Sequence, residues 1–90
     1  MLRLLADPVR WRIVGLLARE QLCTCHLQEE LGARQTLVSH HLRALRDAGV
    51  VETEPCGRFT YYRLAAGALD RLITDLGGLA VGADVPKRPC

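Results

Sequence analysis

One amphipathic stretch, residues 35–49, constrains the fold of this chain more than any other segment. Its sequence is QTLVSHHLRALRDAG. At 3.6 residues per turn, one face of a helix here is apolar, formed by Val38, Leu42 and Leu45. The opposite face carries Thr36, His40 and Arg43, flanked by Ser39 and Ala44, with Asp47 one turn further on. Short polar groups and arginine are suited to approaching base edges. An ordinary surface helix is the alternative interpretation, and the neighbouring segments decide between the two.

The segments before this stretch predict two further helices. A short helix is expected through residues 27–31, and Gly32 is expected to end it in the left-handed conformation. Two helices joined by so short a turn predict a helix-turn-helix. Asp7 and Pro8 favour the start of an earlier helix over residues 8–19. Its apolar positions, expected to lie in the core, are Val9, Ile13, Leu16 and Leu17. We expect Trp11 at the rim of this core or in a dimer contact.

The segments after residue 49 predict a wing and a last helix. Residues 50–54 and 59–64 are expected to form two strands, joined by a turn at residues 55–58 with a basic tip. Residues 65–79 return to helical spacing, and such an apolar helix favours contact with a second copy. The fold class predicted is mainly α (α+β), a winged helix-turn-helix with about five helices and a two-stranded wing. Residues 1–81 would form the DNA-binding and dimerisation domain, and residues 82–90 a mobile tail.

In this fold the helix over residues 35–49 would lie in the major groove, and Arg58 would reach phosphate or the minor groove. The overall charge neither favours nor excludes DNA binding, because 12 basic and 10 acidic residues leave a net charge of only +2.

No apolar run approaches the length of a membrane span, so a cytoplasmic protein is expected. Four cysteines in such a protein favour metal or redox chemistry over a disulfide framework. The sequence has no catalytic constellation, so an enzyme is not expected.

Four motifs resemble, in order and spacing, the ArsR/SmtB family of metal-sensing winged-helix repressors over residues 4–79: LADPVRWRIVGLL, LCTCHLQEELG, QTLVSHHLRALRDAGVV and GRFTYYRL. The resemblance implies a homodimer that occupies double-stranded operator DNA and leaves it when a thiophilic ion binds. It also implies dimer contacts from the first and last helices. The positions that match the DNA-facing residues of the family are Gln35, Thr36, Ser39, His40, Arg43 and, in the wing, Arg58. We interpret His41 as a packed, hydrogen-bonded histidine.

The pair Cys23 and Cys25 falls where the arsenic-responsive branch of this family has its CxC motif. On a regular helix, side chains two positions apart point about 200° from each other. Both thiolates therefore reach one ion only if Cys23 lies outside the helix, with Thr24 as its cap and Cys25 in the first turn. Binding would then pull on this helix and misalign the recognition helix beside it. The resemblance implies As(III) or Sb(III) as the inducer.

The sequence offers several candidates for a third ligand. Trivalent arsenic prefers three thiolates, but Gln28 stands where the branch commonly has a third cysteine, and His26 replaces the acidic residue usual after the CxC motif. Cys90 is the candidate we favour. The alternatives are Cys56, a non-protein thiol or no third ligand, and an incidental thiol is an equally good interpretation of both cysteines.

Other functions remain open from the sequence. The zinc and nickel sensors of the family have ligands along the last helix, where this chain has only Asp70 and Asp75 as acidic residues and no histidine. Sensing of cadmium or lead at the CxC motif is an alternative, although the chain begins too close to Leu4 for the N-terminal arm that completes such sites. A thiol-redox repressor would need Cys56 or Cys90 as a disulfide partner. A metal-buffering or protein-interaction module without specific DNA binding is the alternative from another class.

Overall fold

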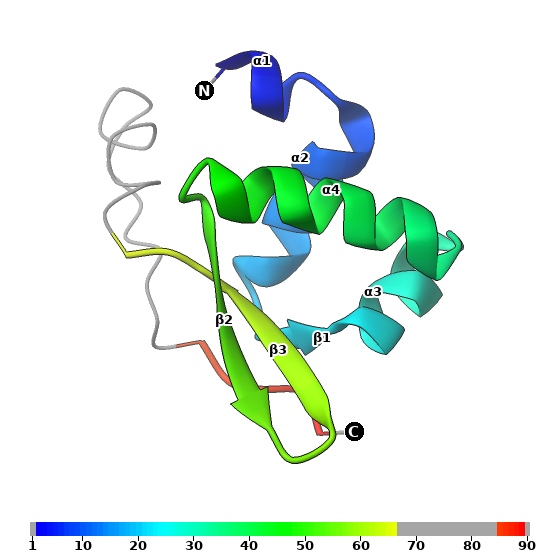
Figure 1. Cartoon of the computed structure of the whole chain (residues 1–90), viewed down its shortest axis with the longest axis vertical. Coiled ribbons are helices and arrows are strands. Elements are labelled where there is room, and N and C mark those ends of the chain that lie inside the picture. Colours follow the sequence, from blue (N-terminus) through cyan, green and yellow to red (C-terminus); the bar gives the residue numbers. More distant parts are fainter. Residues whose placement is uncertain (1, 67–84, 90) are drawn as a thin grey trace.

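The computed structural model describes residues 2–66 and 85–89 (Figure 1). Within these ranges the helices are α1 (Leu2–Leu5), α2 (Pro8–Leu17), α3 (Thr24–Leu31) and α4 (Gln35–Asp47). The strands are β1 (Leu22–Cys23), β2 (Val51–Cys56) and β3 (Phe59–Leu64). This order confirms the predicted winged helix-turn-helix. The further helix expected over residues 65–79 lies almost wholly outside the described residues.

Helix α2 begins where the sequence predicts. The Asp7 carboxylate accepts hydrogen bonds from the backbone N–H groups of Val9 (2.8 Å) and Arg10 (3.3 Å), and Pro8 occupies the first turn. These bonds satisfy donors that have no partner inside the helix. The helix ends at Leu17, two residues before the expected end.

The turn between α3 and α4 also follows the prediction. Gly32 adopts φ +60° and closes α3 as a left-handed cap. Helix α4 starts three residues later and packs its apolar face against α2, α3 and β2. The core of the domain is formed by side chains from all three longer helices and the sheet, among them Ile13, Leu17, Leu27, Val38, Leu42, Leu45, Val50 and Leu64. Burying such aliphatic side chains stabilises the fold by about 1.5–3 kcal/mol each.

The sheet differs from the expected hairpin in two ways. It has three antiparallel strands in the order β1-β3-β2, because Leu22 and Cys23 pair with Tyr62 and Tyr61. A strand of two residues has no sequence period, and it forms here because β3 offers it an edge. In addition, β2 continues through Pro55 to Cys56, because an edge strand tolerates proline. The turn therefore consists of Gly57 and Arg58 and is shorter than the four residues expected.

The described part of the C-terminal segment, residues 85–89, lies against the sheet rather than apart from it (Figure 1). The backbone N–H of Gln21 donates to Pro86 O at 2.7 Å, and the N–H of Arg88 donates to Gln21 O at 3.0 Å. The Tyr61 hydroxyl donates to Arg88 O at 2.6 Å. The open edge beside β1 thus supplies hydrogen-bond partners for residues 85–89, while the mobile tail expected over residues 82–90 stays a prediction.

Candidate nucleic-acid interface and metal centre

Helix α4 presents the predicted polar face to solvent. Its buried positions are Val38, His41, Leu42 and Leu45. The predicted DNA-facing positions are all exposed: Gln35, Thr36, Ser39, His40 and Arg43. This segregation leaves a row of short polar side chains and one arginine accessible along the length of the helix, which is the arrangement that entry into a major groove requires.

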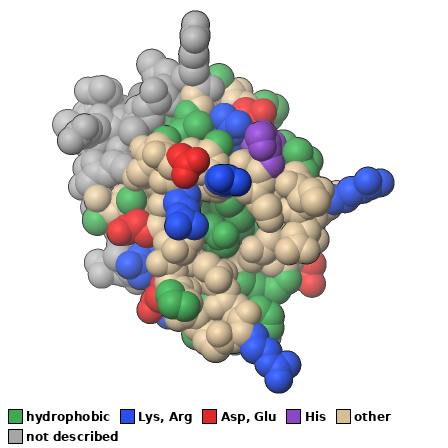
Figure 2. Space-filling view, in the orientation of Figure 1, with side chains coloured by type: hydrophobic (Ala, Val, Ile, Leu, Met, Phe, Trp, Pro, Cys, Tyr) green, Lys and Arg blue, Asp and Glu red, His purple; other side chains and the backbone are tan. Residues whose placement is uncertain are grey.

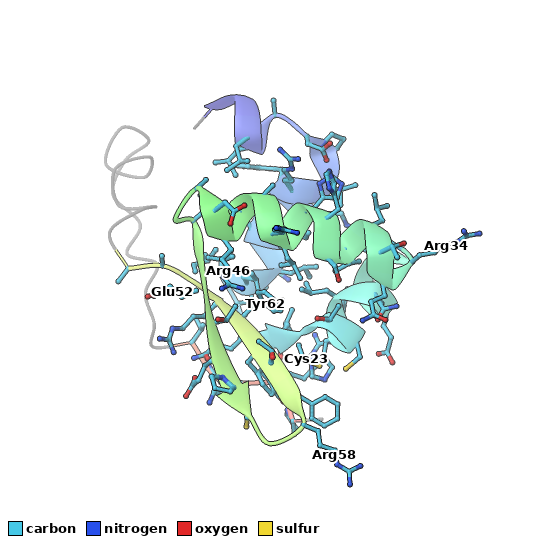
Figure 3. All side chains as sticks on the ribbon, in the orientation of Figure 1. Cys23, Arg34, Arg46, Glu52, Arg58 and Tyr62 are labelled. Carbon is cyan, nitrogen blue, oxygen red and sulfur yellow. The ribbon has the colours of Figure 1, made fainter. Side chains whose placement is uncertain are left out.

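Arginines surround this face. Arg58 projects from the tip of the wing and Arg34 from the start of α4, while Arg46 lies at the other end of α4 (Figure 3). The space-filling view shows Lys and Arg side chains spread over the same side of the molecule, some of them reaching well beyond its body (Figure 2). Arg34 and Arg46 were not among the positions predicted to face DNA. The sequence signals that could have found them are their positions: Arg34 directly precedes α4, and Arg46 follows Arg43 by three residues.

A hollow lies between the start of α3, the first half of α4 and the wing. Its lining comes from all three elements: Cys23, Thr24, Cys25, Gln28, Gln35, Ser39, Arg58, Phe59, Thr60 and Tyr62. Three predicted DNA-facing residues and both cysteines of the CxC motif therefore border one space. The positions predicted to bind metal and those predicted to face DNA are therefore neighbours, which extends the expected contact of the two helices to the wing.

Cys23 lies outside helix α3, as binding of one ion by both cysteines requires. Its backbone is extended (φ −87°, ψ 171°), and the helix begins at Thr24. The N-cap is thus Cys23, so the expectation that Thr24 caps the helix is wrong by one residue. The pairing of Cys23 with Tyr61 holds its backbone in the strand conformation up to the first helical residue. The Cys23 side chain is buried and that of Cys25 is exposed.

His26 lies close to the two cysteines, although it was not predicted as a metal ligand from the sequence. The ligand atoms of Cys23, Cys25 and His26 all lie within 4.8 Å of one another. His26 Nδ1 lies 3.3 Å from Cys23 Sγ and accepts the backbone N–H of Cys23 at 3.2 Å. Once Cys23 is placed at the N-cap, His26 falls at the third helical position, whose side chain commonly reaches back to the N-cap N–H. That spacing is the signal that could have found it.

Of the other candidate thiols, Cys56 does not belong to this group. Cys56 ends β2, opposite Phe59 at the wing turn, and is exposed. Cys90 lies outside the described residues. Within those residues, the group of Cys23, Cys25 and His26 is the set that could hold a metal ion.

His41 is packed and hydrogen-bonded, as expected. It is 6% exposed, and its Nδ1 accepts a hydrogen bond from Arg10 Nε at 3.0 Å. Burial lowers the pKa of His41 below its ordinary value because it disfavours the imidazolium. The neutral ring of His41, in α4, accepts the hydrogen bond from Arg10, in α2, and so connects the two helices.

The described helices include none that combines the length and the apolar character needed to cross a membrane.

Comparison with known proteins gives consistent results. A family model described as the bacterial regulatory protein, arsR family, matches residues 7–53, which is just over half of the chain. The HTH-type transcriptional repressor SmtB of Mycobacterium tuberculosis is 45% identical over 75 residues, covering 83% of this chain and 56% of that protein. The arsenical resistance operon repressor of Staphylococcus aureus is 36% identical over 76 residues, covering 84% of this chain and 73% of that protein.

A solved structure extends the similarity to three dimensions. The homodimeric winged helix-turn-helix DNA-binding domain of a possible ArsR-family transcriptional regulator from Mycobacterium bovis has 31% identity and a TM-score of 0.73, and the match covers 82% of this chain and 68% of that one. The chain spans about half the length of several curated relatives that it matches. With the family model, the relatives and the fold in agreement, this chain belongs to the ArsR family of bacterial regulatory proteins.

Proposed function

We propose that this chain is a transcriptional repressor that binds operator DNA as a homodimer. The observation that carries the proposal is the exposed polar face of α4, set between the wing arginine and further arginines on one side of the molecule (Figure 3). Related proteins that carry the name of repressors, and a similar domain that is homodimeric, support it. The role involves no catalytic step or catalytic cofactor and would be performed in the cytoplasm, where the operator is.

The proposed contacts divide into two kinds. Gln35, Thr36, Ser39, His40 and Arg43 would meet base edges and nearby phosphates in the major groove. Arg58 would meet phosphate or the minor groove from the wing. In a two-fold dimer the two α4 helices would read half-sites about 34 Å apart. A gel shift with the promoter upstream of the gene itself tests this role, and failure to retain that DNA over a scrambled sequence would contradict it.

The inducer we propose is As(III) or Sb(III), bound by Cys23 and Cys25. Thiolates select thiophilic ions, and both sulfurs belong to a group of close ligand atoms. The name of the Staphylococcus aureus relative, an arsenical resistance operon repressor, supports this choice. We propose Cys90 as the third thiolate. An ion at Cys23 and Cys25 would act where α3, α4 and the wing meet, so it would disturb the DNA-facing surface directly.

Cysteine variants test the release step. Cys23→Ser and Cys25→Ser proteins should bind the operator like the wild type but should no longer release it when arsenite is added, because the site has lost a sulfur ligand. Cys90→Ser should behave in the same way, whereas Cys56→Ser is the matched control and should release normally. Gel shifts titrated with arsenite, antimonite, cadmium and an oxidant measure these effects. Loss of operator binding by the serine variants without any ion would contradict the proposal.

A further inference from the structure

We propose that a groove beside the turn between α3 and α4 binds an amphipathic carboxylate, a small molecule with an apolar body and one anionic headgroup, and that this ligand opposes DNA binding. The groove lies where the start of α2, the end of α3 and the start of α4 meet. It shares no lining residue with the hollow that borders the two cysteines. The binding site is independent of the proposed function, whereas its effect on DNA rests on that function.

The size and the walls of the groove fit a small molecule. Its volume is about 580 Å³, and ligand sites usually have about 300–1,000 Å³. Apolar side chains from each side form its walls: Val9, Leu31, Ala33 and Leu37. The first three pack against the core, while Leu37 is 44% exposed. A ligand in the groove would remove apolar surface from water, which favours a ligand with an apolar body.

Two arginines give the groove a positive charge. Arg12 and Arg34 both line it, and neither pairs with a carboxylate among the residues that the structure describes. Arg12 Nη2 donates to Glu30 O at 3.0 Å, which holds the guanidinium beside the end of α3 without neutralising it. The Glu30 carboxylate lies 3.0 Å from Arg88 Nη1 instead. Since a guanidinium has five N–H donors, Arg12 can also bind a carboxylate.

The start of α4 adds to this positive potential. The Arg34 side chain does not cap the helix and projects away from the body of the molecule (Figure 3). The first-turn N–H groups of a helix carry the positive end of its dipole. A change of rotamer would bring the Arg34 guanidinium over a headgroup bound to Arg12. Apolar walls with two cationic side chains therefore favour an anionic amphiphile over a neutral or cationic one.

Occupancy of the groove would act on the DNA-facing surface. Thr36, which is predicted to face DNA, also lines the groove, and Arg34 borders the same surface. A carboxylate bound to Arg34 would cancel a charge otherwise available to phosphate, and it would place a negative charge beside the DNA backbone. Ligand and DNA would therefore lower the affinity of the protein for each other by the same factor.

Decanoate binding by the whole chain without DNA tests the site. Trp11 is the only tryptophan of the chain, is 58% exposed and follows the lining residue Pro8 by one helical turn, so its fluorescence reports occupancy. Decanol and decyltrimethylammonium, which lack the anion, should bind about tenfold more weakly or not at all. Indole-3-acetate is titrated in parallel, and the tighter of the two acids identifies an aliphatic or an aromatic body.

Arg12→Gln is the main variant, because glutamine can still donate to Glu30 O but carries no charge. Its decanoate affinity should fall about tenfold or more, since a charge-assisted hydrogen bond is lost. Leu37→Gln should also weaken binding, because it makes one wall polar. Arg19→Gln, at an exposed arginine outside the groove, is the matched control and should bind decanoate like the wild type.

Methyl NMR of the wild type locates the ligand without any substitution. Decanoate should shift the methyl resonances of Val9, Leu31 and Leu37. Shifts elsewhere in the molecule, equal affinity for decanol, wild-type affinity in Arg12→Gln, or binding only above the micelle concentration would each overturn the site. If sedimentation shows that decanoate or Leu37→Gln breaks a dimer, the groove is an interface between copies and the proposal fails.

The effect on DNA is measured separately. At saturating decanoate, operator affinity of the wild type should fall about tenfold, within the usual range of coupling between two sites. Decanoate binding without this fall would overturn the opposition to DNA. If the chain retains no operator DNA at all, the repressor function fails while the decanoate site stands. If arsenite releases the operator but decanoate does not bind, the repressor function stands and the proposed groove site is overturned.

Discussion

His40 and His41 are neighbours in sequence with opposite environments. His40 is exposed on the face of α4 proposed to meet DNA, whereas His41 lies on the buried face of α4 and accepts a hydrogen bond from Arg10. Burial is the main reason that the pKa of His41 lies below its ordinary value. The Asp7 carboxylate acts in the opposite direction, while the charges of Arg10 and His40 add to the lowering. The folded protein therefore favours the neutral ring.

This environment predicts a pH dependence of stability. Because the folded pKa of His41 lies below the unfolded value of about 6.5, its contribution is present above that pH and is lost as the pH falls towards the folded pKa. Urea unfolding between about pH 8 and pH 5 should show a decline in the wild type that is reduced in His41→Gln. His40→Gln should retain the wild-type decline. Identical profiles for the wild type and His41→Gln would contradict this account.

At the scale of elements, the wing depends on a tight turn. Cys56 and Phe59 pair directly, which leaves only Gly57 and Arg58 to connect β2 and β3. Gly57 has φ +62° at the first turn position, where type II′ hairpin turns favour glycine. Because L side chains rarely adopt this conformation, the glycine is what allows Arg58 to stand at the tip.

Two glycine substitutions should therefore change stability in opposite directions. Gly57→Ala should lower the free energy of unfolding by about 1 kcal/mol, since alanine is strained at positive φ. Gly15→Ala, in α2, should raise it by about 0.5–1 kcal/mol, because the φ there is ordinary and an added Cβ meets open space. Urea unfolding measures both, and changes of the same sign would show that turn strain is not the cause.

The segment over residues 85–89 is held by charge as well as by backbone bonds. Arg88 forms ion pairs with Glu20 and Glu30, the latter at 3.0 Å. Lys87 pairs with Glu54 at 2.9 Å and lies over the Tyr61 ring. The Arg88 guanidinium lowers the pKa of Glu20, and Lys87 lowers that of Glu54. These contacts join the segment to the turn after α2, to α3 and to the wing.

Acid should release this segment. Since the folded pKa values of Glu20 and Glu54 lie below 4.5, the ion pairs hold above that pH and are lost as the pH falls through the folded values. Exchange protection of the Arg88 amide, which donates to Gln21 O, should fall in that range. Arg88→Gln should lose this protection at neutral pH, while α4 amides keep theirs. Full protection of that amide in Arg88→Gln would refute a role for the ion pairs.

At the scale of the whole molecule, folding pairs some acidic residues with cations and leaves several arginines exposed. The acidic residues Glu20, Glu30 and Glu54 contact cations of the C-terminal segment. Exposed arginines border α4 and the wing: Arg34, Arg43, Arg46 and Arg58. On the face shown in Figure 2, Asp and Glu side chains lie among the Lys and Arg side chains, so the net charge of +2 belongs to a mixed surface from which individual arginines can meet phosphate.

Removing one of these arginines should change the salt dependence of operator binding. For Arg58→Ala we expect the slope of log K against log salt concentration to fall by about one, because one phosphate contact is lost. The loss of affinity should be similar for operators of different sequence. Arg19→Ala, at an exposed arginine after α2, is the control and should keep the wild-type slope. A change of base preference without a change of slope would assign Arg58 to base contact instead.

The amino-acid sequence by itself determined the faces of α4, the start of α2 and the end of α3. The α4 face, the start of α2 at Asp7 and the cap at Gly32 were all predictable, because helical periods and caps depend on side chains within about four residues of each other. The separation of buried His41 from exposed His40 followed from the same period. Homodimer formation and the role of residues 65–79 stay predictions.

Only the tertiary structure decided which segments far apart in the sequence contact each other. Strand β1 exists because β3 pairs with it, and residues 85–89 are held because Gln21, far away in sequence, offers its backbone. Pairing with Tyr61 also makes Cys23 the N-cap, and this brings His26 to the two cysteines. These contacts have no period and no local signature, since they form only when the packed core has placed an edge or a neighbour within hydrogen-bond reach.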